Sequence, residues 1–156
     1  MKRISTIALL MLVLTLLVTA VSASVISFEN SQVNAIGDTA TVNLVLDEAP
    51  DGLAGYSIAV AANDPSVASI TAAGFPAWAT MKDNSALPAS SCTLKAADLS
   101  EQVQAGATSI PLATLTLQGL KSGSSSFTVT VTRMSDDSGS KIIPTISAGT
   151  FTVNVP

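Results

Sequence analysis

Apolar side chains recur at every second position in four segments of this chain, with mostly small or polar residues between them. A period of two places successive side chains on opposite faces of a strand. One apolar face and one threonine-rich face are typical of an antiparallel sheet that buries only one side. These segments are residues 41–46, 56–61, 127–132 and 150–155, and residues 92–96 and 112–117 follow the pattern less cleanly.

Turn-forming residues separate these segments, because glycine and aspartate supply the backbone angles that reverse a chain. No stretch has a sustained helical period, and residues 98–103 are compatible with one short helical turn at most. The pattern predicts an all-β chain that folds as a single antiparallel β-sandwich of eight or nine strands. Periodicity alone leaves jelly-roll and immunoglobulin-like connections both open.

The N-terminus is typical of a secretory signal. Lys2 and Arg3 precede an apolar run over residues 7–18, and the small residues Val21-Ser22-Ala23 form a cleavage pattern before Ser24. We therefore expect a signal peptide at 1–23, a single domain at 24–156, and a secreted or cell-surface protein. The alternative is a retained membrane anchor, because the run is close to the lower limit of about 17 residues for a spanning helix.

The charge of the chain argues against nucleic acid as a partner. Of its seven basic residues, two lie in the expected leader, which leaves five against eleven acidic residues, a net charge of −6. These five are scattered, so the chain offers no patch to neutralise a phosphate backbone or an anionic membrane surface. The mature form is not expected to be embedded in a membrane.

Catalytic chemistry has few candidate residues. The chain has no histidine and one cysteine, Cys92, so it lacks a base-activated nucleophile, an internal disulfide and a zinc ligand set. Cys92 is interpreted as a core residue, with a reactive thiol as the alternative. The acidic residues fall mostly in turns, where they bond their own backbone. We expect no enzyme activity, no metal and no cofactor.

Two local segments have an alternative binding interpretation. Asp136–Ser140 carries two carboxylates and a glycine, but it lacks the alternating oxygens of a calcium loop, which favours a hairpin tip. Phe75 and Trp78 are the aromatic residues available for stacking on a sugar, since aromatic residues are only 4% of the chain. A tryptophan that plugs one end of the sandwich is the other interpretation.

Several motifs in a constant order resemble a cohesin domain. Gly52-Leu53-Ala54-Gly55-Tyr56 followed by a strand and Asp64-Pro65 resembles the glycine turn, strand and Asp-Pro step of that family. Residues 37–42 resemble its opening Gly-Asp strand, residues 112–117 its Leu-Ala-x-Leu strand, and residues 136–153 its closing hairpin. The resemblance implies a jelly-roll sandwich of about nine strands, and an extracellular module that binds dockerin modules.

The chain also departs from the family pattern. Asn63 replaces the usual aromatic residue before Asp-Pro, and the strand from Gly52 to Asp64 is one residue longer, which predicts a β-bulge. Gly55 and Ser57 stand where dockerin-binding cohesins carry outward-facing Asn and Asp. Asp64 is predicted to cap the turn that follows the strand, with Pro65 at the first position of that turn.

Three functions follow as hypotheses. The first is a non-catalytic module that binds a dockerin-like protein partner in an assembly linked to polysaccharide handling. Its contact residues would be the small outer side chains Gly55, Ser57, Ala59 and Ala61. The second is a carbohydrate-binding module that uses Phe75 and Trp78 to bind polysaccharide. The third is a structural component of a cell-surface layer.

The leader generates a direct prediction. When the full chain is expressed in a secreting host, the exported protein should begin at Ser24, because the small residues before it fit signal peptidase. Intact mass and N-terminal sequencing of the exported protein measure this. An intact N-terminus recovered in the membrane fraction would instead identify a retained anchor.

Overall fold

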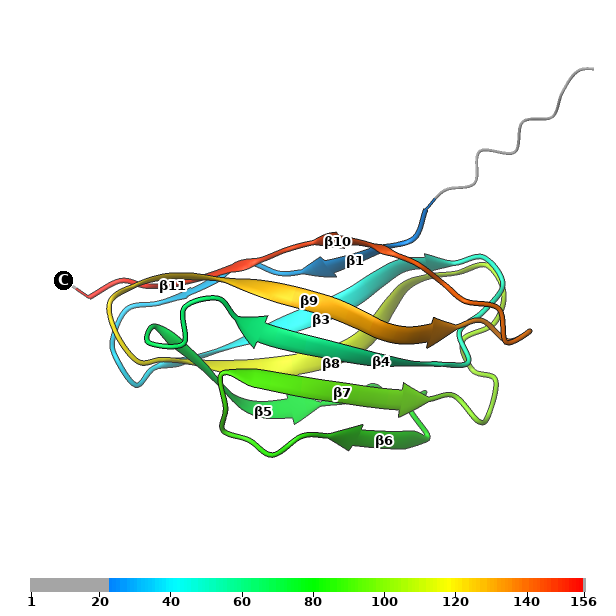
Figure 1. The fold of residues 1–156 in the computed structure, drawn as a ribbon, viewed down its shortest axis with the longest axis horizontal. Helices are drawn as coiled ribbons and strands as arrows, with labels where there is room; N and C mark the ends of the chain where they lie inside the picture. The colour runs from blue at the N-terminus through cyan, green and yellow to red at the C-terminus, as the bar shows by residue number, and fades with distance from the viewer. Residues whose placement is uncertain (1–22, 156) are drawn as a thin grey trace, which may run out of the picture.

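The computed structural model describes residues 23–155, which form eleven strands in two packed sheets (Figure 1). One sheet has the strand order β10-β1-β3-β8-β5 and the other the order β2-β11-β9-β4-β7-β6. The strands are β1 (Val25–Phe28), β2 (Ser31–Val33), β3 (Thr39–Ala49), β4 (Gly55–Ala62), β5 (Ala68–Gly74), β6 (Met81–Asn84), β7 (Ser91–Ala97), β8 (Ala107–Gly119), β9 (Gly123–Ser135), β10 (Thr145–Ser147) and β11 (Thr150–Val153). The all-β sandwich is confirmed.

The strand count differs from the prediction because two segments each cross from one sheet to the other. β1 pairs with β3 in the first sheet, whereas β2, directly after it, pairs with β11 in the second. In the same way, β10 belongs to the first sheet and β11 to the second. The segment that contains β1 and β2 therefore runs parallel to the segment that contains β10 and β11, with β1 paired to β10 and β2 paired to β11. If β1 and β2 are counted as one strand, and β10 and β11 as another, the eleven strands of residues 23–155 become the nine expected.

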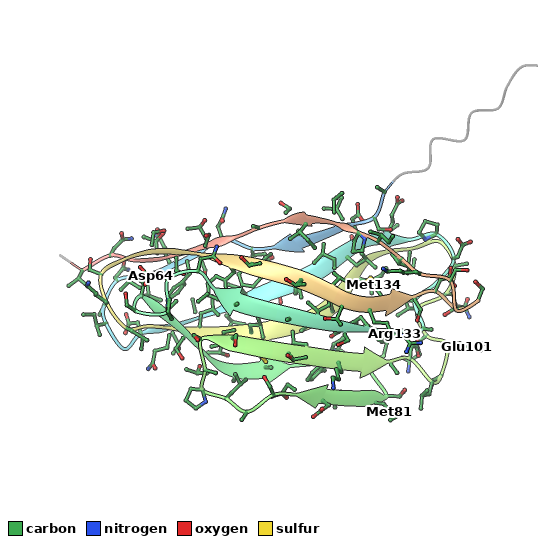
Figure 2. All side chains as sticks on the ribbon, viewed as in Figure 1. Asp64, Met81, Glu101, Arg133 and Met134 are labelled. Carbon is green, nitrogen blue, oxygen red and sulfur yellow. The ribbon has the colours of Figure 1, made fainter. Side chains whose placement is uncertain are left out.

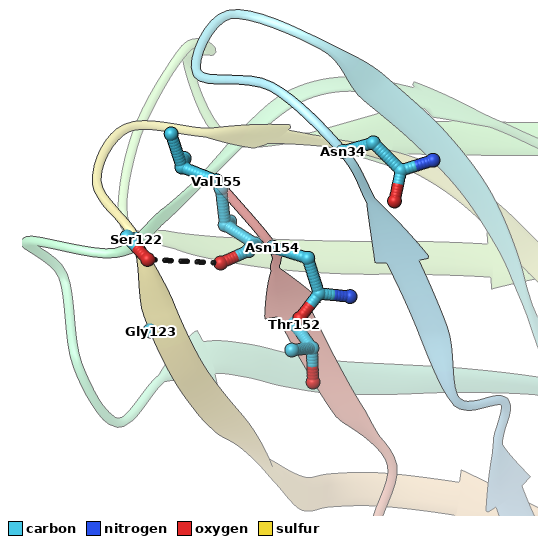
Figure 3. Close-up of a pocket in the computed structure, with 7 residues that line it drawn as sticks. Asn34, Ser122, Gly123, Thr152, Asn154 and Val155 are labelled. Carbon is cyan, nitrogen blue, oxygen red and sulfur yellow. Dashed lines mark hydrogen bonds between the residues drawn. The ribbon is translucent and has the colours of Figure 1, made fainter.

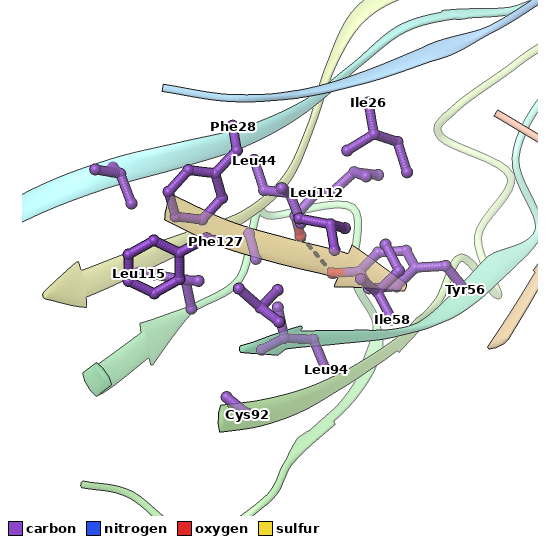
Figure 4. Packing of buried hydrophobic residues seen from close by; sticks show 14 of the residues in the cluster. Ile26, Phe28, Leu44, Tyr56, Ile58, Cys92, Leu94, Leu112, Leu115 and Phe127 are labelled. Carbon is purple, nitrogen blue, oxygen red and sulfur yellow. Dashed lines mark hydrogen bonds between the residues drawn. The ribbon is translucent and has the colours of Figure 1, made fainter. Parts of the chain in front are cut away.

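The core lies between the inner faces of the two sheets. Phe28 and Phe127 stack across it with ring centroids 5.0 Å apart, and Phe151 is a fully buried member of the same cluster. The Tyr56 hydroxyl donates a 2.5 Å hydrogen bond to the Leu112 carbonyl oxygen, which joins β4 to β8 through the interior (Figure 4). Burial raises the pKa of the Tyr56 phenol. Tyr56, Phe127 and Phe151 therefore lie on the buried side of the alternating segments that contain them.

Cys92 is also a core residue, as its place in an alternating strand predicts. Its side chain is 1% exposed on the inner face of β7, and burial raises the pKa of its thiol. A raised pKa leaves less thiolate at neutral pH, so the residue is poorly suited to be a nucleophile.

Residues 98–103 form a turn without a helix. The Asp98 carboxylate accepts hydrogen bonds from the backbone N–H groups of Ser100 and Val103, at 3.2 and 2.7 Å. An aspartate that binds the backbone two and five residues onward holds a loop closed without helical pairing. No helix among residues 23–155 could span a membrane. The expected leader lies outside the described residues up to position 22.

Truncation of a buried leucine in β8 should destabilise the sandwich strongly. Leu115 is fully buried between the sheets, so Leu115→Ala should lower the free energy of unfolding by about 2–5 kcal/mol. Leu99 is 67% exposed, and the matched change Leu99→Ala should alter it by less than about 0.5 kcal/mol. Urea denaturation of both variants measures the difference, and equal losses would contradict the assigned core.

Candidate partner-binding face

The strand β4 presents two different faces. Its inner side chains Tyr56, Ile58 and Val60 are buried in the core. The alternate residues Gly55, Ser57, Ala59 and Ala61 lie on the outer surface of the six-stranded sheet and are half-buried between their neighbours. β4 pairs with β7 on one side and β9 on the other, so these four residues lie near the middle of that sheet. The outward orientation predicted for them is confirmed.

Cross-strand pairing gives each of these residues two flanking side chains. Ala61 lies between Ser91 of β7 and Thr128 of β9, and Ala59 lies between Thr93 and Thr130. Ser57 lies between Lys95 and Arg133. We call the outer surface of β6, β7, β4 and β9 around these residues the β4 face. It carries hydroxyl groups at its Ala61 end and cations at its Gly55 end.

Gly55 is required by the close approach of β4 and β7. A Cβ atom at this position would lie 2.6 Å from the Ala96 carbonyl oxygen, closer than a side chain tolerates. A shallow depression of about 280 Å³ lies at this position, lined by Gly55, Ser57, Lys95 and Arg133 among others. Figure 2 shows Arg133 at this end of the molecule, with Met81 on the neighbouring edge strand β6.

A β-bulge shapes the same end of the face, but it lies in a different strand from the one predicted. β4 pairs with β7 without interruption. The register shift occurs against β9, where Ser57 faces Arg133 and Ile58 faces Val131, so Thr132 is the extra residue. Because Val131 and Met134 both turn inward, Thr132 and Arg133 are both exposed on the outside. A bulge re-aims side chains in this way.

Asp64 caps the turn after β4, as predicted. Its carboxylate accepts hydrogen bonds from the Ser66 backbone N–H at 3.0 Å and the Ser66 hydroxyl at 2.6 Å. These bonds hold the pKa of the Asp64 carboxyl below its ordinary value, because they stabilise the charged form. The Asp64 backbone N–H donates to the Ser125 hydroxyl at 3.0 Å, which ties the turn to β9. Its role is structural.

Trp78 is a core residue. The side chain is 6% exposed, its indole N–H donates to the Pro111 carbonyl oxygen at 2.8 Å, and its ring packs edge-on against Tyr56. Phe75 is half-buried against the same core. This arrangement matches the interpretation of Trp78 as a plug at one end of the sandwich. The Trp78 ring is therefore not available for a sugar to stack on, whereas Phe75 remains partly exposed.

The Asp136–Ser140 segment is a hairpin tip in which the Asp136 carboxylate accepts hydrogen bonds from other residues of the tip. Asp136 accepts hydrogen bonds from the backbone N–H groups of Ser138 and Ser140, both at 2.9 Å, and from the Ser138 hydroxyl at 2.7 Å. These bonds lower the pKa of the Asp136 carboxyl. Within residues 23–155, no cluster of three or more acidic, cysteine or histidine side chains is arranged to hold a metal ion.

A larger depression lies at the end of the sandwich near the C-terminus (Figures 1 and 3), whereas Arg133 lies toward the other end (Figure 2). It measures about 530 Å³ and is lined by Asn34, Ser122, Gly123, Thr152, Val153, Asn154 and Val155. The Ser122 hydroxyl donates to the Val153 carbonyl oxygen at 3.4 Å inside it. Neither an aromatic ring nor a charged group lines this depression.

Comparison by sequence gives no match, neither to a protein-family model nor to a curated protein. Comparison by structure gives cohesins. The cohesin CaCohA2 of Clostridium acetobutylicum superposes with a TM-score of 0.70 at 16% identity, over 85% of this chain and 92% of that one. A non-cellulosomal cohesin of the archaeon Archaeoglobus fulgidus gives a TM-score of 0.66 at 13% identity, over 85% and 91%.

A third similar structure is a type I cohesin–dockerin complex from Clostridium thermocellum, with a TM-score of 0.69 and 12% identity over 85% of this chain and 99% of that one. In each case the similarity spans nearly all of the solved chain. The chain therefore has the cohesin fold, and the resemblance indicated by its motifs is confirmed at the level of the fold.

The Asp64 cap should be measurable by titration. The folded pKa of Asp64 should lie below its ordinary value of 3.8, and Ser66→Ala should raise it, because the strongest stabilising hydrogen bond comes from the Ser66 hydroxyl. The matched variant Ser138→Ala acts on Asp136 and should leave Asp64 unchanged. NMR-detected pH titration of the carboxyl resonances measures both shifts.

The sign of the stability change follows from the lowered pKa. The folded state binds the Asp64 proton less tightly than the unfolded chain, so the cap stabilises the fold above pH 3.8 and this contribution is lost as pH falls through the folded pKa. An Asp64 pKa at or above 3.8, or one that does not respond to Ser66→Ala, would contradict the assigned cap.

Proposed function

We propose that this chain is a secreted, non-catalytic binding module that recognises a protein partner through the β4 face. The domain would comprise residues 24–156, with the segment before it removed on export. The observation that carries the proposal is the row Gly55, Ser57, Ala59 and Ala61 at the middle of an exposed sheet. Small side chains let a partner approach the strand closely over a broad area.

The fold supports a protein partner. Among the solved structures of similar fold are cohesins in complex with dockerins, including two complexes from Clostridium thermocellum. A dockerin-like module is therefore the partner class that we propose for this chain. The extracellular or cell-surface location and the link to polysaccharide handling are part of the same proposal, and they are supported by the leader expected from the sequence and by the resemblance.

The shape of the face also favours a protein over a small molecule. Strands lie about 4.8 Å apart and rise about 3.3 Å per residue, so four strands of the β4 face give a surface on the order of 20 Å by 25 Å. A standard protein interface buries about 800 Å² of accessible surface per partner, which is a similar scale. The depression at Gly55 is only about 280 Å³ and shallow, so it would accept a side chain of a partner.

A bulky charge in the middle of the β4 face should prevent partner capture. The domain of residues 24–156 can be used alone, because its hydrophobic core lies wholly within the described residues. Immobilised Ala59→Arg protein should recover at least about tenfold less partner than the original from the proteins secreted by the native host. Quantitative mass spectrometry of the captured proteins provides the measurement.

The matched control is Ala72→Arg. Ala72 is exposed on β5, at the edge of the opposite sheet, so the same substitution there should leave capture unchanged. Urea denaturation of both variants checks that they remain folded. Equal capture by the Ala59→Arg and original proteins would contradict the proposal, and so would retention of the domain on polysaccharide without a captured protein.

A further inference from the structure

The two cations that flank Ser57 define the chemistry of the partner. Resting on the proposed function, we infer that the β4 face binds an acidic segment of its protein partner, with a carboxylate seated at Ser57 between Lys95 and Arg133. The two basic residues come from strands on opposite sides of β4, and both pair with the same serine. Ser57 is small, so its own side chain does not separate them.

The geometry lets one acidic group or two neighbouring ones reach both cations. Lys95 and Arg133 lie two strand spacings apart, or about 10 Å between backbones, and both are long side chains. Both are exposed, and both line the depression of about 280 Å³ that opens beside Gly55. A guanidinium binds a carboxylate through two parallel hydrogen bonds, and the serine hydroxyl can donate a third from the floor.

The cations lack strong internal partners. Among residues 23–155, neither Lys95 nor Arg133 forms an ion pair, defined as a side-chain nitrogen within 4.0 Å of a carboxylate oxygen. Asp83 of β6 lies beside Lys95 in the register and offsets part of its charge, whereas Arg133 pairs only with Ser57 across β4. The chain is otherwise acidic, with a net charge of −4 over its full length. Two of its few cations therefore meet at one point of the proposed interface.

The same end of the face also limits how far an acidic ligand can extend. β7 and β9 run from the face into two acidic loops, one with Asp98 and Glu101 and the other with Asp136 and Asp137. The pKa of Asp137 is raised by burial and by the neighbouring Glu101, Asp98 and Asp136 carboxylates. A long polyanion that crossed Ser57 along β4 would meet this negative region, whereas a short acidic segment would not.

An apolar contact adjoins the cations. Met81 of β6 is 60% exposed and pairs with Ala97, and a second depression of about 240 Å³ runs between Met81 and Lys95. An exposed methionine adapts to partners of different shape. The matching segment of the partner would therefore carry aspartate or glutamate with an apolar side chain nearby. This composition belongs to a protein and argues against a nucleic acid or an acidic polysaccharide.

Binding of two matched peptides to the domain of residues 24–156 tests this inference. One probe is a soluble helical peptide with glutamates and a leucine on one face, and the other is the same peptide with glutamine in place of glutamate. Fluorescence anisotropy should give at least threefold tighter binding of the glutamate peptide, and the preference should fade in 0.5 M salt as the charges are screened. Polygalacturonate serves as a third, non-protein probe.

Single charge reversals locate the site. Arg133→Glu and Lys95→Glu should each weaken binding of the glutamate peptide about two- to fivefold, and together about tenfold. Lys121→Glu is the matched control, because Lys121 is exposed in the loop between β8 and β9 and makes the same change in net charge. Equal binding of the two peptides, or an equal loss in the Lys121→Glu control, would overturn the inference. Tighter binding of polygalacturonate than of the peptide would also overturn it.

Capture of the natural partner separates the two proposals. If capture is lost in Ala59→Arg and also in Arg133→Glu, both hold. If Ala59→Arg blocks capture and the charge reversals do not, the partner uses the β4 face without an acidic contact, and only the inference fails. If Ala59→Arg does not affect capture, the proposed function itself fails.

Discussion

Burial of one side of β4 determines what its other side presents. Tyr56, Ile58 and Val60 pack between the sheets, and the Tyr56 hydroxyl bonds the backbone of β8 across the core. A slip of one residue in this strand would move all three into solvent and turn Ser57 inward, at a cost of several kcal/mol. The outer row is thus fixed by the core, although its own side chains contribute little to packing.

The neighbours of β4 give this row its chemical character. Gly55 leaves room where β7 approaches, and the extra residue Thr132 in β9 brings Arg133 to the outside opposite Ser57. The result is a face with hydroxyl groups at one end and cations at the other, bordered by acidic loops. Such asymmetry fits a partner held in one orientation, because charge complementarity fixes register more than it adds affinity.

Much of the fold and part of the face could be predicted from sequence, since inner and outer positions follow directly from period two. The capping role of Asp64 could be predicted from turn chemistry. The buried position of Trp78 was one of the two interpretations that the sequence allowed. β6 gave no signal, because its residues Met81–Asn84 are all exposed on an edge and only β7 holds them in place. The meeting of Lys95 and Arg133 depends on the pairing of distant strands. The inward-facing residues Val131 and Met134 are three positions apart, where strand alternation predicts two. This irregularity was the evidence in the sequence for a bulge in β9.

Mapping the contact surface of the captured partner on the folded domain tests the central claim most directly. Amide resonances of the labelled domain would be followed by NMR as the partner is added. We predict that the largest shifts fall on β4, β7 and β9 around Ser57, Lys95 and Arg133, and that the outer surface of β3 and β5 is unaffected. Shifts centred on the depression between Asn34 and Asn154, or on the opposite sheet, would contradict the account.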